Sequence, residues 1–202
     1  MILLPTAYLG NIEYFKIFAA NHDVIIDIHE HYNKQTYRNR CTIYGANGKL
    51  DLIIHIVKGK NQRKSIKETK IANSDNWQKI HWRSIESAYR TSPYFEFYEH
   101  EFNIFYNKKY NWLLDLNNEL TDFILKKIYL NTRINFTTKY EQAVSVKDYR
   151  NYFNPKQNNN FKCQTYNQVF ENKFGFIVNL SIIDLLFNKG PEVETYIKQT
   201  VI

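Results

Sequence analysis

The sequence predicts one mixed α/β (α+β) domain over residues 1–202, in which strands come first and helices follow. Three observations indicate this order. Short apolar runs flank one helical segment near the N-terminus, an Asn-Gly pair separates two strand-like segments, and helical periodicity dominates after residue 73. We therefore expect a strand-rich part at residues 1–72 and a helix-rich part at residues 73–202. The elements are a strand–helix–strand unit, a hairpin forming a small sheet, and a helical C-terminal part.

The N-terminal segment has the pattern of a crossover unit. Residues 2–4 form a short apolar run that ends at Pro5, which suits a first strand. Gly10 and Asn11 then open a helix with a wide apolar face. Residues 24–26 are three apolar residues in succession, which is typical of a strand covered on both faces.

A hairpin follows the crossover unit. Residues 40–45 and 49–57 flank Asn47 and Gly48, and an Asn-Gly pair between strand-like segments is a strong hairpin signal. Residues 65–72 are expected to form one more short strand. Polar loops are expected at residues 59–64 and 154–160.

Helical periodicity begins near Ser74, since Ser74 or Asp75 can cap a helix that Pro93 ends. On this helix His81 and Tyr89 share the inward stripe. Further helices are expected at residues 95–106, 112–130, 146–152 and 179–187, a further strand at residues 136–138, and an extended or helical piece at residues 166–170.

The last long helix carries its own start and stop signals. Ser181 and Asp184 have the spacing of a capping box. Gly190 ends this helix, and Pro191 begins a short terminal one.

Composition excludes several classes of protein. With 44% hydrophobic and 16% aromatic residues the chain is not disordered. Cys41 and Cys163 lie far apart, so neither a secreted disulfide scaffold nor a zinc site of cysteine pairs is expected. The start lacks a basic leader, and no apolar run approaches the ~20 residues that span a bilayer. We therefore expect a cytoplasmic protein without membrane insertion.

The net charge of +7 permits an anionic partner. Nucleic acid is disfavoured, because the basic residues are dispersed and partly matched by acids along the same helices. The phosphate-binding, zinc-protease and serine-hydrolase motifs are all missing. With only six glycines, anion binding has to come from side chains or from a helix N-terminus. No cofactor is predicted.

The most informative segment is residues 29–40, which concentrates cations, amides and tyrosines between two strand-like runs. Lys34, Arg38 and Arg40 could together bind phosphate or carboxylate. The alternative is a polar turn with a solvated charged face. His29 and His31 have a spacing that metals use, but no third ligand is evident nearby, so no metal site is predicted.

Two buried polar positions have two readings each. His81 is either a core histidine with one satisfied hydrogen bond or a general acid/base, for which its unshifted pKa of ~6.5 is suited. Asp184 lies among Ile, Leu and Phe. It is either a helix cap or a buried partner of Lys34 or Arg40.

Five stretches point to a family. They run in order along nearly the whole chain: AYLGNIEYF at residues 7–15, YNKQTYRNRC at 32–41, WQKIHWRSI at 77–85, AYRTSPYF at 88–95, and YNQVF at 166–170 with LSIIDLLFNKG at 180–190. In these stretches the chain resembles the bacterial WbqC-like proteins, which occur among genes for surface polysaccharide (O-antigen) synthesis.

The resemblance implies a role in modifying sugars, and one member has been proposed to transfer glycine to an amino sugar. It supplies no established catalytic residues. The chain departs from the family pattern at residues 53–57, where members tend to end a strand with a proline after an apolar pair and this chain has Ile53-Ile54-His55-Ile56-Val57. If that proline shapes a pocket rim, the rim differs here. The polar positions that match the family pattern are Lys34, Asn39, Arg40, His81, Tyr89, Gln168 and Asp184.

Two functions remain in competition. The first is group transfer of a glycyl, aminoacyl or acyl unit to a nucleotide-linked amino sugar. In it the cations grip phosphate, Asp184 orients a cation, His81 deprotonates the amine and Tyr89 stabilises the oxyanion. The second is a non-catalytic nucleotide-sugar-binding or assembly module. We expect Lys34 and Arg40 to line one recess with His81 and Asp184 at its base. The oligomeric state, the donor and the acceptor sugar stay open. The expected catalytic residues are His81, Tyr89 and Asp184, and the expected substrate-binding residues are Tyr8, Asn11, Lys34, Arg38, Asn39, Arg40 and Gln168.

Overall fold

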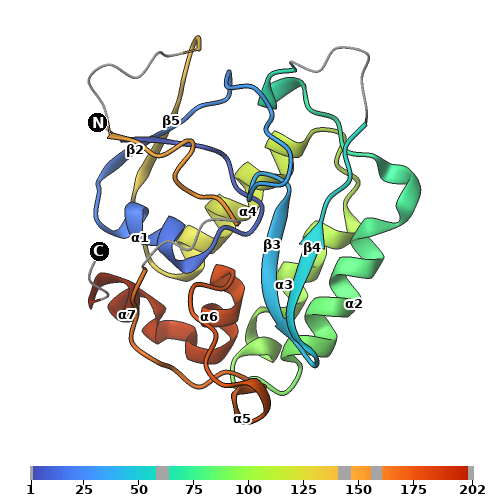
Figure 1. Ribbon diagram of the computed structural model, residues 1–202, viewed down its shortest axis with the longest axis vertical. Coiled ribbons are helices and arrows are strands. Elements are labelled where there is room, and N and C mark those ends of the chain that lie inside the picture. The colour runs from blue at the N-terminus through green and yellow to red at the C-terminus, as the bar shows by residue number, and fades with distance from the viewer. Residues whose placement is uncertain (1, 58–63, 141–146, 156–160, 200–202) are drawn as a thin grey trace.

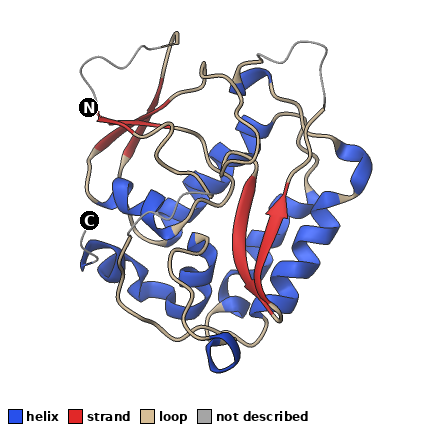
Figure 2. Cartoon of the chain, in the orientation of Figure 1, coloured by secondary structure: helices blue, strands red, loops and turns tan. Residues whose placement is uncertain are grey.

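The structure is a computed structural model that describes residues 2–57, 64–140, 147–155 and 161–199. It is a mixed α/β fold, which confirms the predicted class. A parallel four-stranded sheet has the order β5-β2-β1-β6, and the hairpin β3-β4 forms a separate two-stranded sheet. Figure 1 shows the two sheets standing apart, and Figure 2 shows helices around both. The parallel strands are β1 (Ile2–Leu4), β2 (Asp23–Ile26), β5 (Arg133–Phe136) and β6 (Lys147–Asp148).

The predicted strand–helix–strand unit is present. β1 and β2 pair in parallel, with Leu3 opposite Ile25, and α1 (Ile12–Ala19) connects them. Asn11 begins α1 because its side chain accepts a hydrogen bond from the backbone N–H of Tyr14 at 3.0 Å. Nearly the whole of α1 is buried, because α6 and α7 pack against it.

The hairpin consists of β3 (Arg40–Gly45) and β4 (Gly48–Ile53), and its register places Arg40 opposite Ile53. It ends earlier than predicted, so residues 54–57 leave the sheet. The strand predicted at residues 65–72 is wrong. A 3₁₀ turn at Ile66–Glu68 interrupts it, because Ser65 and Glu68 form a capping box.

The long helices lie close to their predicted positions, with α2 next to α3 and in contact with β3. The N-terminus of α6 differs from the prediction. The Ser181 side chain makes no cap hydrogen bond and donates to the carbonyl of Leu9 at 2.7 Å, so the predicted capping box with Asp184 is wrong. The helices are α2 (Trp77–Tyr89), α3 (Phe95–Asn107), α4 (Leu113–Lys127), α5 (Glu171–Phe174), α6 (Ile182–Lys189) and α7 (Val193–Gln199).

Two predictions near β5 and β6 need correction. The strand predicted at residues 136–138 is β5, and it ends at Phe136. The helix predicted at residues 146–152 is wrong over its described part, which is β6 and a turn in which Asp148 accepts from the backbone N–H of Arg150 at 2.9 Å. Residue 146 and most of the loops predicted at residues 59–64 and 154–160 lie outside the described residues.

A buried ion network holds the carboxyl ends of β2 and β6 together. Asp27 is fully buried, and its Oδ2 accepts from Nη1 of Arg150 at 2.7 Å. Its Oδ1 accepts from the backbone N–H groups of the next turn and from the hydroxyl of Thr137 at 2.9 Å. Beside it, Arg38 donates twice to Glu30, at 2.8 and 2.5 Å. We call Asp27, Glu30, Arg38 and Arg150 the buried ion network.

The network also joins its two halves, because Nη2 of Arg38 donates to the carbonyl of Arg150 at 2.9 Å. The segment from Asp27 to Arg38 has little regular structure, so these contacts determine where its side chains point.

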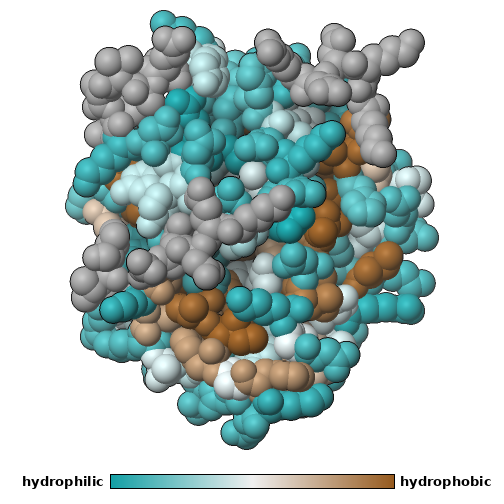
Figure 3. Space-filling model, in the orientation of Figure 1, coloured by the Kyte–Doolittle hydropathy of each residue, from teal (hydrophilic) through white to brown (hydrophobic). Residues whose placement is uncertain are grey.

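The surface in Figure 3 is mostly hydrophilic, and hydrophobic side chains gather there in separate patches, one of them beside β4. Over the described residues, no helix combines the length and the apolar character needed to cross a membrane.

Asp27→Asn should lower the free energy of unfolding by about 3–5 kcal/mol, because Arg150 loses the fully buried one of its two carboxylate partners. Asp148→Asn is the matched control. Asp148 pairs with the same Arg150, but its side chain is 28% exposed, so we expect a loss of about 1 kcal/mol. Urea unfolding of both variants measures the difference, and equal losses would contradict the role given to Asp27.

Candidate functional site

A cavity of about 1170 Å³ opens between the end of the hairpin and the turn before α2. We call it the basic recess. Three parts of the chain that are distant in sequence form it: the connection between β2 and β3, the end of β4 and the residues after it, and the turn that precedes α2. Its lining includes Tyr32, Lys34, Asn39, Arg40, residues 53–57, Lys64, Thr69 and residues 72–75.

The recess carries an excess of positive charge. Among the described residues, Lys34, Arg40 and Lys64 line it, against one carboxylate, that of Asp75. Arg40 also forms an ion pair with Asp51 at 3.3 Å, outside the lining. An anionic ligand is therefore the electrostatic complement of this cavity.

Two polar atoms at the recess have no partner among the described residues. Nε of Arg40 is buried and makes no hydrogen bond. Asn39 is 6% exposed, and its amide nitrogen donates to the carbonyl of Ile54 at 2.7 Å while its Oδ1 accepts nothing. A buried donor or acceptor without a partner lowers the stability of the fold by about 1–3 kcal/mol. Native proteins therefore keep such groups where a ligand or a water molecule supplies the missing hydrogen bond.

A second cavity of about 400 Å³ lies at the carboxyl ends of the parallel strands, the edge where open α/β sheets bind ligands. We call it the carboxyl-end pocket. Arg38 and Arg150 line it, but both are already paired with carboxylates. Arg38, expected to grip phosphate, is therefore engaged with Glu30. Tyr32 lines this pocket and the recess alike.

His81 lies behind the recess and not in its lining. It is 3% exposed, its Nδ1 hydrogen-bonds the hydroxyl of Tyr8 at 2.9 Å, and the ring also bonds the backbone of Ile53. The Tyr8 hydroxyl continues the chain to Tyr106 at 2.9 Å. Burial lowers the pKa of His81 to about 4, so the ring is neutral at pH 7 and the expected pKa near 6.5 is wrong.

Asp184 is the centre of a separate buried cluster. Its carboxylate accepts from the hydroxyls of Tyr89 at 2.9 Å and Tyr166 at 2.6 Å, and from the amide of Gln168 at 2.9 Å. The Tyr89 hydroxyl also accepts a hydrogen bond from the backbone N–H of Tyr44 at 3.1 Å. Its hydrogen-bonding groups are therefore already used inside the core. Burial raises the pKa of Asp184 to about 6.

The expected ion pair of Asp184 with Lys34 or Arg40 is wrong. All three side-chain donors to Asp184 are neutral, and the carboxylate that pairs with Arg40 is Asp51. Lys34 lies at the recess and is exposed. Asp184 is therefore not at the base of the recess, and it binds the core segments of the C-terminal half to α2.

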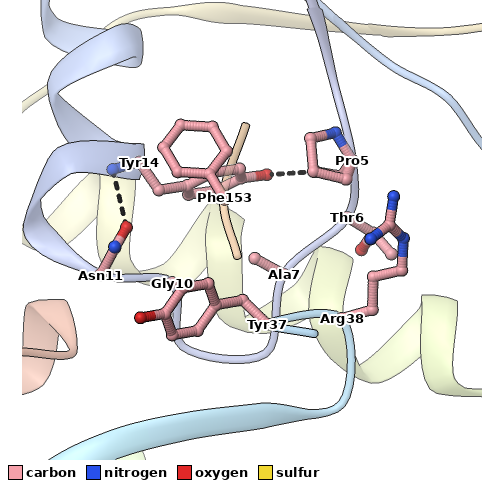
Figure 4. Close-up of a pocket in the computed structure, with 9 residues that line it drawn as sticks. All are labelled: Pro5, Thr6, Ala7, Gly10, Asn11, Tyr14, Tyr37, Arg38 and Phe153. Atoms are coloured by element: carbon pink, nitrogen blue, oxygen red, sulfur yellow. Dashed lines mark hydrogen bonds between the residues drawn. The ribbon is translucent and has the colours of Figure 1, made fainter. Parts of the chain in front are cut away.

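Asn11 and Arg38 face a third, very small cavity, shown in Figure 4, which leaves no room for a water molecule. In this view the Asn11 side chain turns to the backbone of Tyr14, and the Tyr14 hydroxyl donates to the carbonyl of Pro5 at 2.9 Å. Asn11 therefore shapes the start of α1.

His29 and His31 have other partners than a metal. The His29 ring lies 3.1 Å from the hydroxyl of Thr137 and 3.2 Å from Nζ of Lys67, and the His31 ring stacks on Tyr140. Among the residues that the structure describes, no three His, Cys, Asp or Glu side chains are grouped to hold a metal ion.

The structure thus brings three of the expected site residues together, Lys34, Asn39 and Arg40. The sequence analysis missed Lys64, His55 and Asp75 at the recess. Of these, only His55 carried a signal, as the departure from the family pattern at a suspected rim. It also missed Asp27 and Arg150, whose pairing joins residues 123 positions apart.

Two comparisons with known proteins give a match. The WbqC-like protein family matches residues 6–156. The uncharacterised protein Rv1507c of Mycobacterium tuberculosis is 28% identical over 213 residues, which cover 92% of this chain and 91% of that protein. No solved structure matches the chain significantly.

His81→Gln should remove a pH dependence of stability. The pKa of His81 is about 4 in the folded protein against an ordinary value of 6.5, so the unfolded chain binds the extra proton between these values. Wild type therefore loses up to about 3 kcal/mol as the pH falls from 6.5 to 4, and the glutamine variant loses less. Urea unfolding of both proteins at pH 7 and 4.5 measures this. A constant difference between them would show that His81 does not titrate as described.

Asp184→Asn should have the opposite signature. The pKa of Asp184 is about 6 in the folded protein against an ordinary value of 3.8, so the folded protein binds the extra proton in this window. Wild type should gain stability relative to the variant as the pH falls from 6 to 4, by up to about 3 kcal/mol. The same unfolding measurements at pH 7 and 4.5 provide the comparison, and a gap that is the same at both values would contradict it.

Proposed function

Since this chain belongs to the WbqC-like protein family, we propose that it is a group-transfer enzyme of surface polysaccharide (O-antigen) synthesis. Its acceptor is a nucleotide-linked amino sugar, and the transferred group is a glycyl, aminoacyl or acyl unit. We place the reaction in the cytoplasm. The observation that carries the proposal is the pair of unpartnered atoms, Nε of Arg40 and Oδ1 of Asn39, at a cavity with excess positive charge.

In this proposal the recess holds the nucleotide sugar. Its volume of about 1170 Å³ is slightly above the range of roughly 300–1,000 Å³ of small-molecule sites, which leaves room for a ligand of two or three linked rings. Lys34, Arg40 and Lys64 neutralise the diphosphate, and the free Nε–H of Arg40 donates to one of its oxygens. Oδ1 of Asn39 accepts from a hydroxyl or amine of the ligand.

The other expected residues act from a distance. His81 supports the recess wall through Ile53, and Arg38 holds the segment that carries Lys34 and Arg40 through its pair with Glu30. Tyr89, Gln168 and Asp184 fasten the C-terminal half, since their polar groups are saturated by one another. We assign these residues positioning roles and not contacts with substrate.

Calorimetry with uridine diphosphate tests the binding part. Wild type should bind, and Lys34→Ala and Arg40→Ala should each weaken binding about tenfold or more, because hydrogen bonds to charged groups contribute about 1.5–3 kcal/mol. Lys198→Ala is the matched control. It removes the same charge from α7, outside the recess lining, and should leave the affinity unchanged.

The transfer part is tested by mass spectrometry of nucleotide amino sugars incubated with activated glycine or acyl donors. A mass increase of one transferred group supports the enzyme. Uridine diphosphate binding without product from any donor supports a non-catalytic binding module. Absence of both binding and product contradicts the proposal.

A further inference from the structure

His55 and Asp75 form a hydrogen-bonded pair at the basic recess. Nδ1 of His55 lies 2.9 Å from Oδ2 of Asp75, and both residues line the cavity. Ser74 donates to the other carboxylate oxygen at 2.8 Å. The two side chains come from the chain after β4 and from the turn before α2, so the recess itself brings them together.

The pair determines which ring nitrogen of His55 is available. An ionised carboxylate only accepts hydrogen bonds, so Nδ1 must carry the proton that Asp75 accepts. The hydrogen bonds from His55 and Ser74 lower the pKa of Asp75, which keeps it ionised at neutral pH. Nε2 then has a free lone pair, and no described residue donates to it.

His55 differs from His81 in its exposure to the cavity and in having a ring nitrogen that accepts a proton. The His55 side chain is 64% exposed at the cavity, whereas His81 is buried behind it. Nδ1 of His81 bonds Tyr8, and its ring also bonds the backbone of Ile53, so no part of that ring is directed to solvent.

We propose that His55 is the general base of the transfer and that Asp75 orients it, an inference that rests on the proposed function. The acceptor amine attacks the carbonyl carbon of an activated acyl donor, an acyl phosphate or a thioester. The new C–N bond forms, and the nitrogen loses a proton to Nε2 of His55. The bond to the phosphate or thiolate breaks, and that group leaves with the electron pair.

The activity arm compares His55→Gln, Asp75→Asn and the control His100→Gln, which alters an exposed histidine of α3 outside the recess. His55→Gln should lower kcat at least about 100-fold and leave KM for the nucleotide sugar within about twofold. Asp75→Asn should lower kcat about tenfold. A kcat of His55→Gln within twofold of wild type overturns the proposal.

The second arm needs no turnover. Diethyl pyrocarbonate should modify His55, and bound uridine diphosphate should slow this reaction at least fivefold while the exposed His22 and His100 react unchanged. If uridine diphosphate binds but does not protect His55, the base proposal fails and the proposed function stands. If wild type neither binds uridine diphosphate nor forms product, both fail. Equal unfolding free energies of wild type and His55→Gln show that the fold is intact.

Discussion

The buried ion network is the constraint on which the rest of the structure depends. Asp27, Glu30, Arg38 and Arg150 are each at most 7% exposed, and transferring such charges out of water carries a large desolvation penalty. The penalty is offset because every carboxylate oxygen in the network has a donor. The connection between β2 and β3 has little regular structure of its own, so these contacts hold it in place, and through it the cations of the recess.

The polar residues expected at the site fall into two kinds, and the difference indicates where chemistry is possible. Tyr8, His81 and Asp184 are buried and fully bonded to one another or to their neighbours, so they stabilise the fold. Arg40 and Asn39 each keep one side-chain atom at a cavity that has no hydrogen-bond partner in the described part of the chain. Residue type alone does not separate these two kinds. His81 of the first kind and Arg40 of the second are equally plausible site residues from the local sequence.

Local patterns predicted most of the fold. Strand–helix–strand order, the Asn-Gly turn and helical periodicity depend on neighbours in sequence, and these elements are present. One prediction failed because a distant group competes for a side chain: Ser181 donates to Leu9 and not to its own helix. Others failed locally, as at residues 65–72, where Ser65 and Glu68 cap a 3₁₀ turn. At the site the failures came from distant contacts and burial. Lys34 and Arg40 were identified from charge, but the pairing of Arg38 and the lowered pKa of His81 follow from contacts and burial that no local pattern reports.

Tyr32 has a consequence beyond its own packing. Tyr32 lines both the basic recess and the carboxyl-end pocket, so one residue belongs to the walls of two cavities. A change in its position therefore alters both cavities. Ligands bound in the two cavities would then influence each other through this one residue. By thermodynamic reciprocity, each ligand would change the affinity for the other by the same factor.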